Sequence, residues 1–242
     1  MKITLFKKYP YVQKLIVLAL LLILVVFVYS RSSKPFINLD FLASQEKIKN
    51  LNGMLINDMK STKEDNFVAN NINYGKSIAL TKRLYKIVES HCDKRSKRGN
   101  STYHGPNKNN EKFHYLIDMI EDMDIFEDTG NIVIIINKDG EEGVEHRDHD
   151  CPGWVSEFIW IRTNNDKLFY VKDNFNIKRY INCNIMWFDD MRRHNITPID
   201  KDSFSIRVNG KFNKRFREYM YHNAPFKNQI NREAFLKNVD RY

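Results

Sequence analysis

Hydrophobic and polar residues follow three different patterns along this chain of 242 residues, and each predicts a different part of the fold. Near the N-terminus, Leu15 to Tyr29 is an uninterrupted apolar run. Between residues 41 and 125, apolar residues recur at three- and four-residue steps, the spacing of amphipathic helices. From Asn131 onward they form short β-branched runs between polar turns, which is typical of strands.

The helical pattern has three segments. We expect helices from about Phe41 to Lys60, from Ile78 to Cys92 and from Glu111 to Met123. The stretch 93–112, between the second and third, is rich in Lys, Arg, Asn, Gly and Ser, which predicts a loop.

The second half of the chain predicts a series of short strands with no helix between them. They are Asn131 to Asn137, Val144 to Asp148, Val155 to Arg162, Leu168 to Lys172, Asn182 to Phe188 and Ser203 to Val208. Strands without intervening helices favour a sandwich or barrel over βαβ units. Helices followed by such strands predict an α+β fold.

The apolar run at residues 15–29 predicts a membrane anchor. It is short for a span of about 17 to 25 residues, but Tyr11 and Tyr29 lie where interfacial aromatics would. The heavier positive charge before the run predicts a cytoplasmic N-terminus and a lumenal or extracellular remainder, which makes a single-pass membrane protein. A signal peptide, cleaved to give a secreted protein, is the alternative. Residues 31–40, with Ser-Ser-Lys-Pro, are expected to be a linker.

Composition and charge narrow the function classes. Hydrophobic residues make up 42% and aromatics 13%, which excludes a fully disordered chain. Three cysteines exclude a disulfide framework. The formal charge of +9 is compatible with nucleic acid, an anionic membrane or an acidic partner. Because the basic residues are scattered, a generally basic surface is the simpler interpretation, and nucleic acid is not the expected partner.

One short motif carries candidate chemistry. His146 and Asp148 are two residues apart on a predicted strand, so that both side chains point to one face. His194 lies 46 residues further on and can supply a third ligand. Two histidines and one carboxylate are the ligand set of non-haem Fe(II) oxygenases.

The last predicted strand adds an inward cation. Ser203, Ser205 and Arg207 share one face of this strand, and the apolar residues share the other. If the apolar face packs on helices, Arg207 points into the barrel, where a buried guanidinium needs an anion such as the distal carboxylate of a dicarboxylic acid.

These segments resemble a known family. HRDH, FIWIR, FYVKD, WFDD, His194 and SIRVNGKF are similar to the catalytic core of Fe(II)/2-oxoglutarate-dependent oxygenases, in particular small members with an HRDH-type motif. The resemblance implies a double-stranded β-helix (jelly roll), Fe(II) held by His146, Asp148 and His194, and 2-oxoglutarate bound by Arg207 with Ser205. It implies O2 as co-substrate, with succinate and CO2 as products, and ascorbate as a candidate reductant.

The resulting domain interpretation has three parts. Residues 1–30 form the N-terminus and the anchor, residues 31–40 the linker, and residues 41–242 the oxygenase domain. Within that domain we expect a helical layer at 41–125, the β-helix core at 130–212 and a basic C-terminal extension at 213–242. A membrane-anchored oxygenase in the secretory pathway suggests a peptidyl acceptor. A catalytically inactive jelly-roll binding module and a nucleic-acid-modifying oxygenase are the alternatives.

Other candidate residues have simpler interpretations. A zinc site from His146, His149, Cys151 and Cys183 has suitable ligands, but its spacing matches no compact zinc finger. His149 is expected to face away from His146. Trp160, Tyr170 and Trp187 either line a co-substrate pocket or form plain core, the commoner role of strand aromatics.

Overall fold

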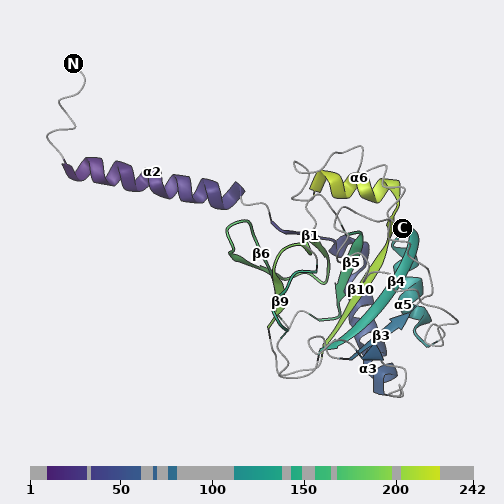
Figure 1. Cartoon of the computed structure of the whole chain (residues 1–242). Coiled ribbons are helices and arrows are strands. Elements are labelled where there is room, and N and C mark those ends of the chain that lie inside the picture. Colours follow the sequence, from purple (N-terminus) through teal and green to yellow (C-terminus); the bar gives the residue numbers. More distant parts are fainter. Residues whose placement is uncertain are drawn as a thin grey trace, which may run out of the picture.

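A computed structural model describes most of the chain, and all structural statements refer to the described residues. These are 10–31, 34–60, 68–69, 76–80, 112–137, 143–148, 156–164, 168–197 and 203–223. The elements are α2 (Pro10–Arg31), β1 (Phe36–Asn38), the 3₁₀ turn η1 (Asp40–Leu42), α3 (Gln45–Lys60), β2 (Val68–Ala69), β3 (Lys76–Leu80), α5 (His114–Asp122), β4 (Phe126–Asn137), β5 (Phe158–Arg162), β6 (Phe169–Lys172), β7 (Lys178–Ile181), β8 (Ile185–Phe188), β9 (His194–Ile196), β10 (Ser203–Phe212) and α6 (Lys214–Asn223) (Figure 1).

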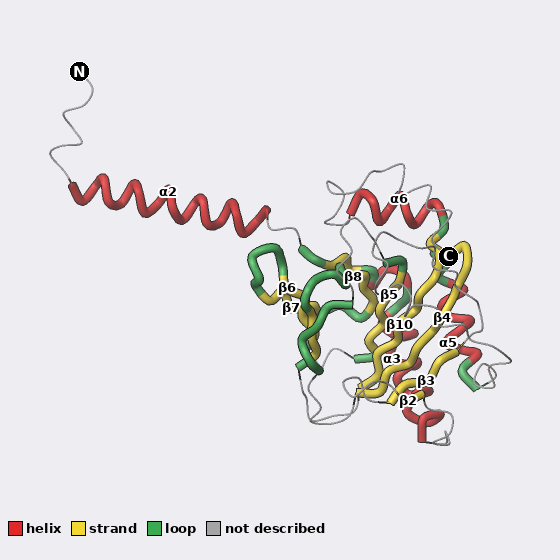
Figure 2. Tube along the Cα trace, in the orientation of Figure 1, coloured by secondary structure: helices red, strands yellow, loops and turns green. Residues whose placement is uncertain are grey.

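The strands form two antiparallel sheets. The larger has the order β1-β8-β5-β10-β4-β3-β2 and the smaller has the order β7-β6-β9. After β5 the chain enters the smaller sheet for β6 and β7, returns for β8, leaves again for β9 and returns for β10. This crossing between two sheets is the arrangement of a jelly roll. Figure 2 shows the smaller sheet beside β8, β5 and β10 of the larger one. The predicted α+β class is therefore confirmed.

The register of β5 against β10 gives these central strands an inner and an outer face. Arg207 lies opposite Trp160, and Ser205 lies opposite Arg162. Residues directly opposite in an antiparallel pair point to the same side. Trp160 stacks on Phe169 of β6, with 6.1 Å between ring centroids. All four residues therefore face the smaller sheet, which is the inner face.

The outer face of β5 and β10 is apolar and covered by helices. Ile159, Ile161, Ile206 and Val208 are fully buried. They share one core with buried residues of the two helices that lie behind the larger sheet in Figure 2. These are Ile48, Leu51 and Leu55 of α3 and Leu116 and Ile120 of α5. Burying this face turns the polar inner face toward the interior between the sheets.

A buried ion pair fastens α6 to the larger sheet. Arg217 donates from Nε to Oε1 of Glu157 at 2.7 Å and from Nη2 to Oε2 at 3.0 Å. Glu157 Oε2 also accepts the backbone N–H of Phe212 at 2.8 Å. The predicted C-terminal extension thus begins with a helix that belongs to the fold, and residues 224–242 lie outside the described part.

Two predicted elements differ in the structure. Residues 76–80 form strand β3, which pairs with β4, so a helix beginning at Ile78 is wrong, and residues 81–92 lie outside the described part. Part of the expected linker belongs to the larger sheet, because β1 pairs with β8 through Ile37 and Trp187. The Asp40 carboxylate then accepts the backbone N–H groups of Asn184 and Ile185, both at 2.8 Å.

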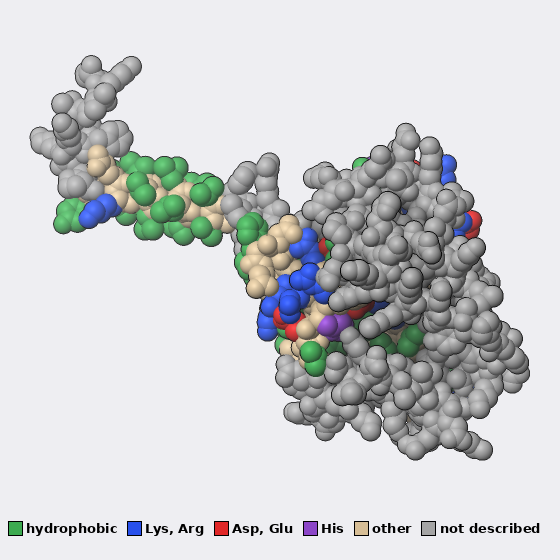
Figure 3. Space-filling model, in the orientation of Figure 1, with side chains coloured by type: hydrophobic (Ala, Val, Ile, Leu, Met, Phe, Trp, Pro, Cys, Tyr) green, Lys and Arg blue, Asp and Glu red, His purple; other side chains and the backbone are tan. Residues whose placement is uncertain are grey.

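Helix α2 projects from the rest of the protein (Figure 1). Its described side chains, from residue 11 to residue 26, are exposed and mostly apolar, and Figure 3 shows them on the visible side of the helix. Among the described residues, no helix has both the length and the apolar character needed to cross a membrane.

Candidate metal centre

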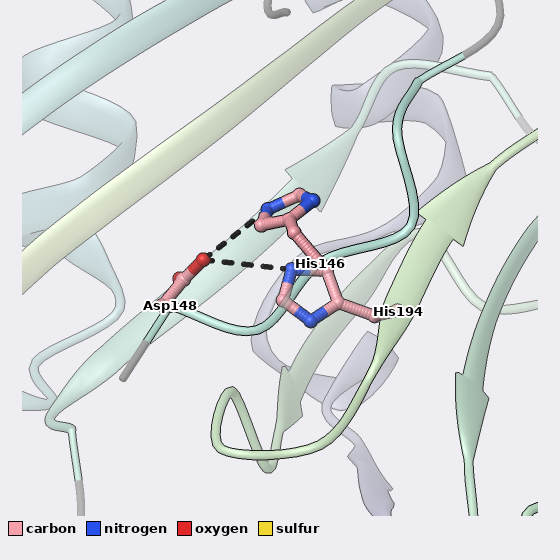
Figure 4. A group of neighbouring side chains, drawn as sticks. All are labelled: His146, Asp148 and His194. Atoms are coloured by element: carbon pink, nitrogen blue, oxygen red, sulfur yellow. Dashed lines mark ion pairs between the residues drawn. The ribbon is translucent and has the colours of Figure 1, made fainter. Parts of the chain in front are cut away.

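The predicted metal ligands come together from two segments that are distant in sequence (Figure 4). His146 and Asp148 lie on the segment 143–148, and His194 is the first residue of β9. His146 and His194 exchange backbone hydrogen bonds of 3.2 and 2.9 Å, and the Asp148 N–H donates to the Asp190 carbonyl at 2.9 Å. The chain around His194 therefore holds the segment in place.

The three side chains point at one another. Oδ1 of Asp148 lies 3.3 Å from Nε2 of His146 and 3.6 Å from Nε2 of His194. One donor atom from each residue lies within 4.8 Å of the others. Neighbouring donors around an octahedral ion with bonds of about 2.1 Å lie about 3 Å apart, so the three side chains would move inward to bind one.

Backbone carbonyls orient both imidazole rings. Nδ1 of His146 lies 2.6 Å from the Val144 carbonyl, and Nδ1 of His194 lies 2.9 Å from the Arg192 carbonyl. Because a carbonyl only accepts, Nδ1 carries the proton and the lone pair of each neutral ring is on Nε2. When both rings are neutral, both lone pairs are directed at the position between the three side chains.

The local charges favour the ligand form of two of the three groups. Burial by itself would raise the pKa of Asp148, but the Arg207 charge and the His146 hydrogen bond lower it well below its ordinary value. Burial lowers the pKa of His194. For His146, burial is outweighed by the hydrogen bonds to Asp148 and Val144, so its pKa is raised. At neutral pH, Asp148 is ionised and His194 is neutral, as metal ligands must be.

Arg207 lies beside this cluster and is held on three sides. Nη1 donates to Oδ2 of Asp148, Nη2 donates to Oδ2 of Asp190 at 3.0 Å, and Nε donates to Oδ1 of Asn209 at 2.9 Å. The guanidinium carbon lies 4.1 Å from the centroid of the Phe158 ring. Arg207 therefore points inward, as the strand pattern predicts. The carboxylates that it binds in the structure are those of Asp148 and Asp190, whereas the sequence analysis expected the carboxylate of a co-substrate.

Glu145 fastens the segment 143–148 to the outer face of the smaller sheet. Its carboxylate accepts hydrogen bonds from the Tyr170 hydroxyl and from Nζ of Lys172, both at 2.8 Å. The Lys172 hydrogen bond lowers the pKa of Glu145. Gly143 adds a backbone hydrogen bond to the Ile196 carbonyl at 3.3 Å. These bonds tie the residues that precede His146 to strands β6 and β9.

The segment from Val144 to Asp148 was predicted to be a strand, and this is wrong. It makes a single bridge, between His146 and His194. The side chains of His146 and Asp148 nevertheless converge, because the backbone bonds of both residues set their direction.

Of the other residues considered in the sequence analysis, some belong to the described part of the chain and some lie outside it. Ser205 is buried on the inner face, opposite Arg162. His149 and Cys151 lie outside the described residues. Cys183 is absent from the described metal-ligand group, and burial with the nearby Asp40 charge raises its pKa to about 12. The described residues therefore do not support a zinc thiolate site.

Sequence reasoning missed two residues that support the site. Asp190 binds Asp148 through its backbone and Arg207 through its side chain, and Glu145 anchors the segment. Asp190 is the last residue of the WFDD sequence and Glu145 directly precedes His146, but the partners of both are distant in sequence.

The donor set fits a divalent iron ion. Two neutral imidazoles and one carboxylate suit Fe(II) and leave coordination positions open. His194 packs against Phe188 and Phe169, with ring centroids 4.9 and 6.0 Å away, so apolar rings line one side of the centre. His146 is partly exposed. On the face drawn in Figure 3, histidine, Lys and Arg side chains gather near the end of the domain from which α2 projects.

Comparisons with known proteins find likeness in structure only. No family model and no curated protein matches the sequence. A prolyl-4-hydroxylase from Pseudomonas putida aligns at a TM-score of 0.43 and 10% identity, over 78% of this chain and 97% of that one. A prolyl hydroxylase from Trichoplax adhaerens, solved with a hypoxia inducible factor peptide fragment, aligns at 0.45 and 14%, over 76% and 85%. The non-heme alpha ketoglutarate dependent carbocyclase SnoK of nogalamycin biosynthesis aligns at 0.41 and 7%, over 73% and 79%.

Proposed function

We propose that this protein is an Fe(II)- and 2-oxoglutarate-dependent oxygenase that hydroxylates a C–H bond. One observation carries the proposal: two imidazole nitrogens and one carboxylate oxygen converge from distant segments to within 4.8 Å. In this reaction class, one atom of O2 enters the acceptor and the other enters succinate, which forms from 2-oxoglutarate with release of CO2.

The chain's own residues position this chemistry. His146, Asp148 and His194 would hold the iron, and the backbone carbonyls at Val144 and Arg192 keep each Nε2 directed at it. Phe169 and Phe188 limit water beside His194. The bound metal and co-substrate would supply the oxidising chemistry.

Succinate release tests the proposal. The full-length protein with Fe(II), ascorbate and 2-oxoglutarate should form succinate, slowly without an acceptor and faster with one. Asp148→Ala should abolish it. If the wild-type protein binds neither metal nor 2-oxoglutarate, it is the inactive binding module instead.

The acceptor and its location belong to the same proposal. We propose that residues 15–29 attach the protein to a membrane and that the catalytic domain lies on the lumenal or extracellular side. The exposed apolar side chains of α2, among them Leu20, Leu21 and Leu22, support attachment, since water disfavours them. A peptidyl acceptor follows from that location. Protection of the domain from protease in intact vesicles tests the topology, and a mass gain of one oxygen in candidate peptides tests the acceptor.

A further inference from the structure

The turn between β6 and β7 exposes two large apolar side chains. Residues 174–178 are all exposed, and among them Phe175 is 55% exposed and Ile177 is 42% exposed. Neither residue is part of the core or of the metal-ligand group. Because water disfavours apolar side chains, a pair of them at the end of one hairpin indicates a surface that contacts another apolar body.

Hydrogen bonds fix this turn, so the exposure is built into the hairpin. The Asp173 carboxylate accepts the backbone N–H groups of Phe175 and Ile177 at 2.9 and 3.0 Å. Its second oxygen accepts Nε of Arg179 at 2.7 Å. Asn176 has a φ of 63°, a left-handed conformation that asparagine adopts more readily than most residues. The turn therefore holds Phe175 and Ile177 outward.

The outer face of the hairpin, next to this turn, is positively charged. Lys172 and Lys178 are directly opposite in the register of β6 and β7, so both point to the side on which Lys172 binds Glu145. Oε1 of Glu145 lies 2.8 Å from Nζ of Lys172 and 3.7 Å from Nη1 of Arg193, so one carboxylate balances two cations. Nζ of Lys178 lies 4.4 Å from the centroid of the Tyr170 ring. Because like charges directly opposite repel, an anionic surface against this face would stabilise it.

The hairpin lies on the side of the domain from which α2 projects (Figure 2). Helix α2 ends at Arg31 and β1 begins at Phe36, so at most about 18 Å of chain separates the apolar helix from the larger sheet. Lys and Arg side chains gather at the same end of the domain in Figure 3. A membrane that takes up α2 would therefore face the hairpin as well.

We propose that the hairpin tip, residues 174–178, docks on an anionic phospholipid bilayer. Phe175 and Ile177 enter the boundary between headgroups and acyl chains, and Lys178 contacts the lipid phosphates beside them. Aromatic and aliphatic side chains next to basic ones are typical of interfacial membrane contacts. The inference rests on the proposed attachment of residues 15–29 to a membrane and adds a second contact to it. It does not depend on the oxygenase chemistry.

Photocrosslinking in the full-length protein tests the contact. Phe175→p-benzoylphenylalanine places a photoreactive group at the tip. Met54→p-benzoylphenylalanine is the control, because Met54 is 42% exposed on α3, which lies behind the larger sheet. Each protein is mixed with vesicles of phosphatidylglycerol and phosphatidylcholine, isolated with them by flotation, irradiated and analysed by intact-mass spectrometry. The Phe175 probe should form lipid adducts, and the Met54 probe should form none.

Charge variants test the role of the anionic headgroups. In the protein that carries the Phe175 probe, Lys178→Glu should lower the adduct yield at least about fivefold, the contribution of one basic side chain near an anionic surface. Lys49→Glu makes the same change in net charge at an exposed position of α3 and should leave the yield unchanged. Equal yields in these two variants would overturn the anionic partner.

The remaining outcomes are distinguishable from one another. Protein that floats with the vesicles but gives equal lipid adducts, or none, from both probes overturns the hairpin contact and leaves the attachment by residues 15–29 standing. Adducts between the Phe175 probe and a second copy of the chain overturn it in favour of self-association. A wild-type protein that does not float with the vesicles refutes the proposed attachment, and this inference with it, whereas succinate release tests the oxygenase separately.

Discussion

Asp190 is not one of the three proposed ligands, yet we expect Asp190→Asn to weaken metal binding. Its carboxylate accepts a hydrogen bond from Arg207 at 3.0 Å, and Arg207 in turn donates to the Asp148 oxygen that does not face the histidines. The substitution removes a negative charge close to the metal position. It also leaves Asp148 as the one described carboxylate bound to Arg207, so the guanidinium competes more strongly with the metal. Both effects lower affinity.

The expected loss of metal affinity follows from the contact of Asp190 with Arg207, which in turn binds the proposed ligand Asp148. Loss of a residue that orients a metal ligand typically costs 10- to 100-fold in metal affinity, or about 1.4 to 2.7 kcal/mol. The side chain is 3% exposed, so solvent screens the interaction little. Folding stability should fall as well, by about 1.5 to 3 kcal/mol, because a hydrogen bond between charged groups is weakened.

Anaerobic calorimetric titration with Fe(II) measures the affinity, and urea unfolding of the metal-free protein measures the stability. Asp189→Asn is the matched control, because the adjacent Asp189 carboxylate binds Nε of Arg192 at 2.7 Å instead of Arg207. The control should lose stability without losing metal affinity. Equal metal affinities in the wild type and Asp190→Asn, or equal losses in the two variants, would refute the reasoning.

Three further predictions concern pH, backbone and packing. Because the pKa of His146 is raised above its ordinary 6.5, metal affinity should fall about tenfold per pH unit as pH drops through that pKa, and a pH-independent affinity contradicts this. Gly143→Ala should destabilise the fold, since a Cβ would overlap the Asn195 side-chain oxygen, whereas Gly53→Ala in open space on α3 should stabilise it by about 1 kcal/mol in thermal unfolding. Arg217→Met breaks a buried ion pair and should cost about 3 to 5 kcal/mol in urea unfolding, with Fe(II) affinity unchanged.

Hydrophobic periodicity was sufficient to predict the elements whose own side chains are buried in the core. β8 is apolar at every position and β5 at every position except Arg162, and all residues of both strands are buried. Both strands can therefore be predicted without knowing their partner strands. The helix predicted from residue 41 appears as α3, from Gln45 to Lys60, because a whole stripe of it faces the core. In each of these elements, the pattern of apolar residues alone identifies the element in the sequence.

Elements defined by distant partners were not predictable in this way. β1 has three residues and exists because Phe36–Asn38 pairs with Met186, Trp187 and Phe188. β3 has apolar residues that also fit a helical spacing, and its pairing with β4 decides between the two. In both cases the deciding hydrogen bonds connect residues far apart in the chain, which a local pattern does not contain.

The same distinction holds for the site: the face on which a side chain lies could be predicted from the sequence, but its partners could not. Strand alternation was enough to place Ser205 and Arg207 on one inward face, and the charge of a buried arginine requires an anion. The identity of that anion depends on Asp148 and Asp190, which arrive from two other segments. The resemblance implies that Arg207 binds the co-substrate, whereas in the structure its guanidinium donates to the carboxylates of Asp148 and Asp190.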